Sequence, residues 1–246
     1  MDEALVAGTV TIIGAGGDEI GAYLARPQGR ESFGGVVVIH HMPGYDSATK
    51  EITRKFAAYG YAALMPNLYH RDAPGASPDD AAAVARAKGG VPDERLVGDV
   101  AGAADHLRGL PGCNGKIGVI GYCSGGRQSF LAACSLQLEA AVDCYGGAVV
   151  KVPEGAPASM KPLLGLAKDL SCPLLGLFGA DDSFPTLEET AELSRTLHDF
   201  GKPHEFHTFA GAGHAFFSVD RTAYRVEAAN EGWAKIWDFL GRYLAG

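Results

Sequence analysis

The sequence predicts an α/β fold: a mostly parallel, doubly wound sheet with helices on both faces, preceded by an N-terminal β-hairpin. After residue 35, short apolar runs typical of buried strands alternate with segments whose apolar residues recur at helical spacing. The 246 residues, 47% of them hydrophobic, can form one large core. No linker, repeat or low-complexity segment divides the chain, so we expect a single domain spanning residues 1–246.

The elements follow in order. Residues 5–13 and 20–26 predict two strands joined by a glycine-rich turn, and the absence of a following helix disfavours a dinucleotide-binding loop. Further strands are expected at 35–41, 61–65, 116–122, 138–145, 174–178 and 204–209. Helices are expected at 49–59, 94–107, 127–134 and 186–197, with a closing helix that carries Val226, Trp233, Ile236, Trp237 and Leu240 on one stripe. The stretch 66–80, rich in Pro, Gly and Asp, predicts a loop.

Composition excludes several classes of function. The formal net charge of −8 includes no basic run, which argues against nucleic acid as a partner. No segment approaches the roughly 18 apolar residues of a membrane span, and the N-terminus resembles no secretory signal, so no membrane partner is expected. Five cysteines without CxxC spacing indicate reduced thiols. We expect a cytoplasmic protein, either monomer or homodimer.

The most informative motif is Gly-Tyr-Cys-Ser-Gly-Gly at 121–126, between an apolar run and a predicted helix. This is the pattern of a nucleophile elbow with Cys123 in place of the usual serine. Such a turn strains the nucleophile's backbone, and the flanking glycines supply the room it needs. Backbone N–H groups at the helix start favour a thiolate and later an oxyanion. The alternative is a tight turn that carries a buried cysteine.

A nucleophilic cysteine needs a base and a group that orients the base, which in folds of this type follow in the order acid, then histidine. The predicted strand 174–178 runs into Asp181 and Asp182, and the strand 204–209 leads to His214. The spacing Gly179-x-x-Asp182 favours Asp182 as the acid, while Asp181 caps the next helix or faces water. The alternative for His214 is a loop histidine held by the backbone.

These motifs resemble the dienelactone hydrolase family, within the α/β-hydrolase fold, over essentially the whole chain. The matching segments are Pro66-Asn67-Leu68-Tyr69, residues 121–126, residues 179–182 and Gly211-Ala212-Gly213-His214-Ala215-Phe216. The resemblance implies a Cys123–His214–Asp182 triad, a small-molecule ester or lactone substrate, and neither metal nor organic cofactor. The backbone N–H groups of Ser124 and Met42 would then hold the oxyanion.

The sequence departs from that family at the substrate site. Aligning the loop after residues 35–41 puts His41 where the family has a glutamate, so a standing Cys123–His214 ion pair is expected as the resting state, and His41 is equally open to a functional and a structural role. Of two arginines that bind the substrate carboxylate in the family, one corresponds to Arg86 if the alignment has no gap, and the other falls on Ser218. Arg71 and Arg221 are nearby and could substitute.

Several further residues have two interpretations. Tyr122, Phe216, Phe217 and Tyr45 line an apolar pocket or simply pack. Arg127, a cation in the first turn of a helix, requires either a buried acidic partner or a substrate carboxylate. His40 is expected at a buried strand end, and a zinc site from His40, His41, His70 and His214 is disfavoured because no pair has ligand spacing.

The sequence thus predicts a cysteine-dependent hydrolase of small esters or lactones. Two alternatives remain open: a general carboxylesterase or thioesterase without dienelactone activity, and a non-catalytic ligand-binding protein on the same fold.

Overall fold

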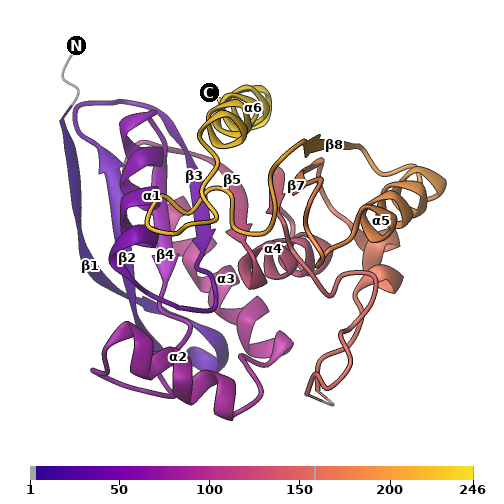
Figure 1. The fold of residues 1–246 in the computed structure, drawn as a ribbon. Helices are drawn as coiled ribbons and strands as arrows, with labels where there is room; N and C mark the ends of the chain where they lie inside the picture. The colour runs from indigo at the N-terminus through magenta and orange to yellow at the C-terminus, as the bar shows by residue number, and fades with distance from the viewer. Residues whose placement is uncertain (1–3, 158, 246) are drawn as a thin grey trace.

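The computed structural model describes residues 4–157 and 159–245. One eight-stranded sheet in the order β1-β2-β4-β3-β5-β6-β7-β8 forms its centre (Figure 1). Strands β1 (Leu5–Ile13) and β2 (Glu19–Pro27) form an antiparallel hairpin, and β2 pairs antiparallel with β4 (Ala62–Pro66). The remaining strands are parallel: β3 (Phe33–Ile39), β5 (Cys113–Tyr122), β6 (Ala140–Cys144), β7 (Leu174–Gly179) and β8 (His204–Phe209). The predicted doubly wound sheet and its N-terminal hairpin are confirmed.

Helices cover both faces of the sheet and bury a separate core on each. One core packs α2 (Pro78–Ala87), α3 (Asp93–Arg108), α4 (Ser124–Ser135) and α5 (Leu187–Asp199) against the sheet. The other packs α1 (Ser47–Ala58) and α6 (Val226–Leu244), through side chains such as Phe56, Ile236 and Leu240. This two-sided burial explains why the parallel strands are continuous apolar runs rather than alternating patterns.

The structure adds elements that the sequence did not predict. Helix α2 follows the loop after β4, and short 3₁₀ segments occur at Ala15–Gly17 (η1) and Leu164–Asp169 (η2). Helix α2 begins at Pro78 behind the capping side chain of Ser77, and it buries only alanines: Ala81, Ala82 and Ala85. A stripe of alanines has little hydrophobic contrast with its surroundings, so its helical period was weak in the sequence.

Candidate active site

The candidate site begins where β5 runs into α4. Cys123 stands between them with φ 57° and ψ −120°, a backbone conformation that a non-glycine residue rarely adopts. Its backbone N–H donates to the Cys144 carbonyl oxygen at 3.0 Å, which ties the turn to the end of β6. The geometry is that of the predicted elbow, with the Cys123 side chain at the carboxyl edge of the parallel strands.

Two glycines make this turn possible. A Cβ atom on Gly121 would clash with the carbonyl oxygen of Gly125, and one on Gly125 would lie 2.5 Å from the Ile39 carbonyl oxygen. Both positions therefore require glycine for close backbone approach, and the second allows α4 to pack directly on the end of β3.

Two later loops bring His214 and Asp182 together beside the elbow. The Nδ1 atom of His214 lies 2.9 Å from Asp182 Oδ2, and Asp182 Oδ1 accepts a hydrogen bond from the Phe184 N–H at 2.9 Å. The backbone N–H of Asp181 donates to the Ala212 carbonyl oxygen at 2.9 Å, which holds the loops against each other. Asp182 is buried and Asp181 is exposed, and the structure brings the carboxylate of Asp182, not that of Asp181, to His214.

The surroundings of His214 favour its protonated form. Burial acts to lower the pKa, but hydrogen bonds with Asp182 and Cys123 outweigh it and raise the pKa of His214 to about 10. The imidazole thus links Asp182 on one side to Cys123 on the other. His214 is therefore an imidazolium at neutral pH, and the ion pair with a Cys123 thiolate stays a prediction.

A small cavity of about 190 Å³ opens on the Ser124 side of the elbow. Ser124 and Met42, the expected oxyanion donors, both line it. The loop that carries Met42 is held by two contacts: the Tyr69 hydroxyl donates to the Met42 carbonyl oxygen at 2.7 Å, and the Leu68 N–H donates to His40 Nε2 at 3.3 Å. Burial lowers the pKa of His40 to about 4, so this imidazole is neutral and accepts that hydrogen bond. His40 is structural, as the sequence favoured.

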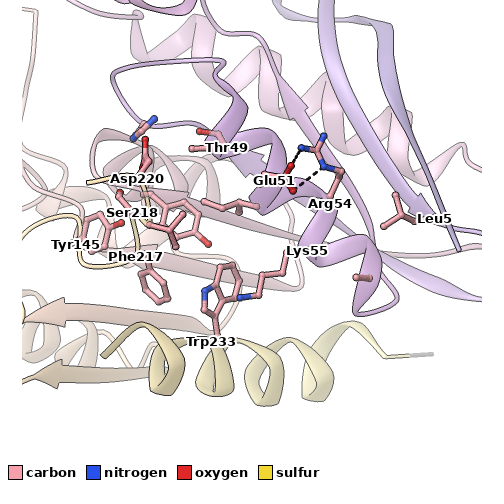
Figure 2. Close-up of a pocket in the computed structure, with 16 residues that line it drawn as sticks. Leu5, Thr49, Glu51, Arg54, Lys55, Tyr145, Phe217, Ser218, Asp220 and Trp233 are labelled. Atoms are coloured by element: carbon pink, nitrogen blue, oxygen red, sulfur yellow. Dashed lines mark hydrogen bonds and ion pairs between the residues drawn. The ribbon is translucent and has the colours of Figure 1, made fainter. Parts of the chain in front are cut away.

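A larger cavity of about 450 Å³ opens on the Tyr122 side (Figure 2). It lies between α1, the loop after His214, and α6. Its aromatic wall is formed by Tyr122, Tyr145, Phe217 and Trp233. The Tyr145 ring lies 5.1 Å from the His214 ring, so the cavity begins beside the candidate catalytic residues. Tyr122 therefore lies where the sequence placed it.

His41 lines the same cavity and is held by an acidic partner. Its Nε2 atom lies 2.7 Å from Asp46 Oδ2. Asp46 also caps α1, because its Oδ1 atom accepts the Thr49 N–H at 2.8 Å. Burial acts to raise the pKa of Asp46, but the hydrogen bonds from His41 and Thr49 lower it to about 2. The site thus has a histidine–carboxylate pair near the position where the resemblance implies a glutamate.

Two expected substrate contacts are corrected by the structure. Arg71 donates to both carboxylate oxygens of the buried Asp99 at 3.0 Å and to Asp18 at 2.6 Å, so its guanidinium is engaged at the β1–β2 turn and lines neither cavity. Phe216 is fully buried in the core against Phe209, and its neighbour Phe217 lines the larger cavity instead.

Of the other candidate arginines, Arg221 is exposed and lines neither cavity, so its role stays a prediction. Arg86 is exposed in the last turn of α2, near enough to Tyr69 to act on its pKa but lining neither cavity, so its role stays a prediction. Arg127 lines the small cavity, where Asp93 accepts from both of its Nη atoms at 2.9 and 3.1 Å. Of the two interpretations of Arg127, the structure provides the acidic partner.

Sequence reasoning missed two residues near the elbow. Tyr145 follows β6 with φ 45°, and its position directly after a parallel strand was a usable signal. Asp143 lies inside β6 beneath the first turn of α4, fully buried, with Oδ1 accepting the Gly146 N–H at 2.8 Å. Burial raises the pKa of Asp143 to about 7. No signal in the sequence distinguished this aspartate from an ordinary strand residue.

Within residues 4–157 and 159–245, no group of three or more His, Cys, Asp or Glu side chains is arranged to hold a metal ion. Across the same residues, no helix is both long and apolar enough to pass through a bilayer.

The doubly wound sheet, the strained elbow and the histidine–carboxylate pair define an α/β-hydrolase. A family model described as "Dienelactone hydrolase family" matches residues 20–244, so the chain belongs to that family and is a hydrolase of the ester and lactone type.

Similar proteins agree with this membership. The chain is 32% identical over 254 residues to a protein of Escherichia coli (strain K12) named "Putative carboxymethylenebutenolidase", with 98% of this chain and 89% of that protein covered. It is 31% identical over 252 residues to a protein of the same name from Salmonella typhimurium, with the same coverage. A crystal structure of a "Putative Dienelactone Hydrolase" from Klebsiella pneumoniae superposes with a TM-score of 0.87 at 28% identity, covering 98% of this chain and all of the other.

Proposed function

We propose that this protein hydrolyses small esters and lactones with Cys123 as the nucleophile, His214 as the proton carrier and Asp182 as the group that orients His214. The observation that carries the proposal is a single juxtaposition. Cys123 is held in a strained conformation at the elbow, close enough to His214 to help raise its pKa, and His214 Nδ1 lies 2.9 Å from the carboxylate of the buried Asp182. A merely structural cysteine has no need of that arrangement.

In the proposed reaction the Cys123 thiolate attacks the carbonyl carbon while His214 holds the thiol proton. The carbon–oxygen bond to the leaving group breaks, and His214 gives its proton to the departing oxygen, leaving a thioester on Cys123. Water then loses a proton to His214 and adds to the thioester carbonyl. The carbon–sulfur bond breaks, and the free acid and the thiolate are restored. For a lactone, the departing oxygen stays attached to the acyl group.

The proposed oxyanion hole is formed by the N–H groups of Ser124 and Met42. Ser124 is the first residue of α4, whose N–H has no partner within the helix, and the helix dipole favours negative charge there. Met42 lines the same small cavity on a loop held by Tyr69 and His40. Such preorganised donors are worth most when they do not have to move during the reaction.

The substrate is proposed to be a lactone or a simple ester. The name carboxymethylenebutenolidase of the relatives supports a lactone. A second candidate is a general carboxylesterase, and the lack of free arginines favours it. Arg71 is engaged by Asp99 and Asp18. Ser218 stands where the resemblance implies an arginine. A site with fewer free arginines discriminates less strongly for an anionic lactone.

The experiment compares turnover of a dienelactone and of p-nitrophenyl acetate by the wild type, Cys123→Ala and, as a matched control, Cys113→Ala. We expect turnover of at least one substrate to disappear in Cys123→Ala and to persist in Cys113→Ala. Dienelactone turnover identifies the family activity, and ester turnover alone identifies the carboxylesterase. Turnover of neither substrate, or turnover that survives loss of Cys123, would contradict the proposal.

A chemical test separates an enzyme from a ligand-binding protein on this fold. We expect iodoacetamide to alkylate Cys123 rapidly and with a stoichiometry of one at neutral pH, and His214→Ala to slow this reaction strongly, because the imidazolium holds the thiolate. Burial raises the pKa of Cys134 and of Cys172 to about 12, so these thiols are expected to stay unreactive. Mass spectrometry of the labelled peptides gives the result. Equal labelling of Cys123 with and without His214 would contradict the ion pair.

A further inference from the structure

The larger cavity extends well beyond the residues of the proposed reaction. It starts at Tyr145 and Tyr122, beside the elbow, and continues along one face of α1 through Ala48, Ile52 and Lys55. A helix rises about 1.5 Å per residue, so Ala48 and Lys55 lie roughly 10 Å apart along its axis. This is space for a substantial group attached to the reacting ester, whereas hydrolysis itself requires only the region next to Cys123.

The wall opposite α1 is a continuous aromatic surface. The Tyr122 ring meets Phe217 edge-to-face at 5.7 Å, and Phe217 meets Trp233 at 5.4 Å. Tyr122, Phe217 and Trp233 are each less than a tenth exposed, so their packing fixes the shape of the wall. Such a surface favours an apolar or aromatic group.

The far end of the cavity carries a positive charge. The Lys55 ammonium lies over the Trp233 ring, 4.0 Å from its centre, as Figure 2 shows. The side chain is half-buried, and this burial lowers the pKa of Lys55. Among residues 4–157 and 159–245, no carboxylate lies within ion-pair distance of Lys55. A partly desolvated ammonium held only by an aromatic face is a ready partner for an anion.

Of the charged residues that line the cavity, Lys55 is the one best placed to bind an anion. Arg54 also lines the cavity, but it is hydrogen-bonded to Glu51 and to the Tyr23 hydroxyl. Asp220 lies at the opposite end, beside Ser218, and would repel an anion there (Figure 2). Glu51 also lines the cavity, but its carboxylate is paired with Arg54, so the charge that no side-chain partner offsets is negative near Ser218 and positive at Lys55.

We propose that the cavity binds an apolar arm of the substrate and that Lys55 pairs with a carboxylate at the end of that arm. The substrate class is an ester or lactone with an anionic group several bonds from the reacting carbonyl, recognised by a lysine rather than by Arg71 or Arg86. The proposal rests on the proposed function for the location of the reacting ester and adds to it the length and charge of the substrate.

Matched ester pairs test the proposal. The acyl-side pair is p-nitrophenyl octanoate and the mono-p-nitrophenyl ester of octanedioic acid. The alcohol-side pair is the acetate of octan-1-ol and the acetate of ω-hydroxyoctanoic acid. Each is assayed with the wild type, Lys55→Met and Lys235→Met. The Lys55 replacement keeps an apolar stem against Trp233 and removes the charge. Lys235, on α6, lines none of the cavities around the elbow and is the matched control for net charge.

In at least one pair we expect the wild type to prefer the carboxylated ester in kcat/KM by about fivefold to tenfold, the range of a well-placed ion pair at a half-buried site. Lys55→Met should abolish the preference by lowering kcat/KM for the carboxylated ester, while Lys235→Met should keep it. The short mono-p-nitrophenyl ester of butanedioic acid should show no preference over p-nitrophenyl butanoate. Absence of any preference, or a preference that survives Lys55→Met, would overturn the proposal.

A binding measurement keeps this test separate from catalysis. Cys123→Ala protein is titrated with monomethyl octanedioate and with dimethyl octanedioate, followed by tryptophan fluorescence, because Trp233 lines the cavity and contacts Lys55. The monoanion should bind about fivefold more tightly, and Lys55→Met should make the two equal. If the monoanion binds as expected but no ester is hydrolysed, the proposed function fails and the anion site stands. If esters are hydrolysed without any preference for the carboxylated substrate, the proposed function stands and the anion site at Lys55 fails.

Discussion

The two cavities beside the elbow differ in what holds their walls. On the Ser124 side the walls are fixed by polar contacts: Tyr69 to Met42, His40 to Leu68 and Arg127 to Asp93. On the Tyr122 side they are fixed by aromatic packing among Tyr122, Phe217 and Trp233. Cys123 lies between Tyr122, which lines one cavity, and Ser124, which lines the other.

This difference fits the two tasks that the proposed function gives to the site. Hydrogen bonds fix the direction of backbone donors, which stabilisation of a developing oxyanion requires. Aromatic packing fixes a shape but few directions, which suits recognition of an apolar group. We expect changes on the polar side to affect kcat and changes on the apolar side to affect which substrate is selected.

The strongest test of this separation is Asp182→Asn. An amide in place of the carboxylate leaves His214 without its charged partner and permits the wrong tautomer, so we expect kcat to fall by about a thousandfold for every substrate. Asp181→Asn is the matched control, since Asp181 is exposed and the structure places it away from His214, and it should change kcat little. Steady-state kinetics on p-nitrophenyl acetate measure both. Equal loss in the two variants would show that the loop, and not the carboxylate at His214, is what matters.

The sequence predicted where the polar residues of the candidate site lie better than where its apolar walls lie. Cys123, Asp182 and His214 follow the ends of strands, where a glycine-rich turn or a fixed spacing marks them, and parallel strands bring those ends to one edge. Tyr122, directly before Cys123, both lines the larger cavity and packs against Phe217, and its contact with substrate stays a prediction. Phe216 was wrong by one position: Phe216 and Phe217 both pack in the core with their ring centres 4.7 Å apart, and only the tertiary packing decides that Phe217 is the one that lines the larger cavity.

Charged residues were harder to place than the strand ends. Nothing local to Arg71 shows that Asp99, 28 positions later, will lie against it. The same holds for Lys55, which looks like an ordinary exposed lysine of α1 until Trp233, on a helix far along the chain, meets it. Long-range partners determine whether a charge is satisfied, and sequence spacing carries little information about them.

A second prediction concerns Asp143, which lies beneath α4 and lines neither cavity. Burial raises its pKa from the ordinary value of 3.8 to about 7. Because the folded state favours the protonated carboxyl, its contribution to stability is complete below about pH 4 and is lost as the pH rises through 7. Between pH 4 and pH 8 the free energy of unfolding of the wild type should therefore fall by about 1 to 3 kcal/mol more than that of Asp143→Asn, whose amide stays neutral. Urea denaturation at both pH values measures this. A wild-type pH dependence unchanged by the substitution would rule out a raised pKa at Asp143.

The last prediction tests whether the polar side acts through orientation. Tyr69→Phe removes the hydroxyl that holds the Met42 carbonyl oxygen at 2.7 Å and leaves the ring in the core. With the loop less constrained, the Met42 N–H spends less time directed at the oxyanion, so kcat should fall by about tenfold. KM should change little, because the contact matters in the transition state and not for the bound ester. Tyr45→Phe serves as the control, since Tyr45 lies in the same loop but lines neither cavity, and its hydroxyl makes no hydrogen bond in the part of the chain that the structure describes. A rise in KM at constant kcat would instead assign Tyr69 to substrate binding. The cavity on the Ser124 side would then also bind the substrate, and the two cavities would not differ in function as we expect.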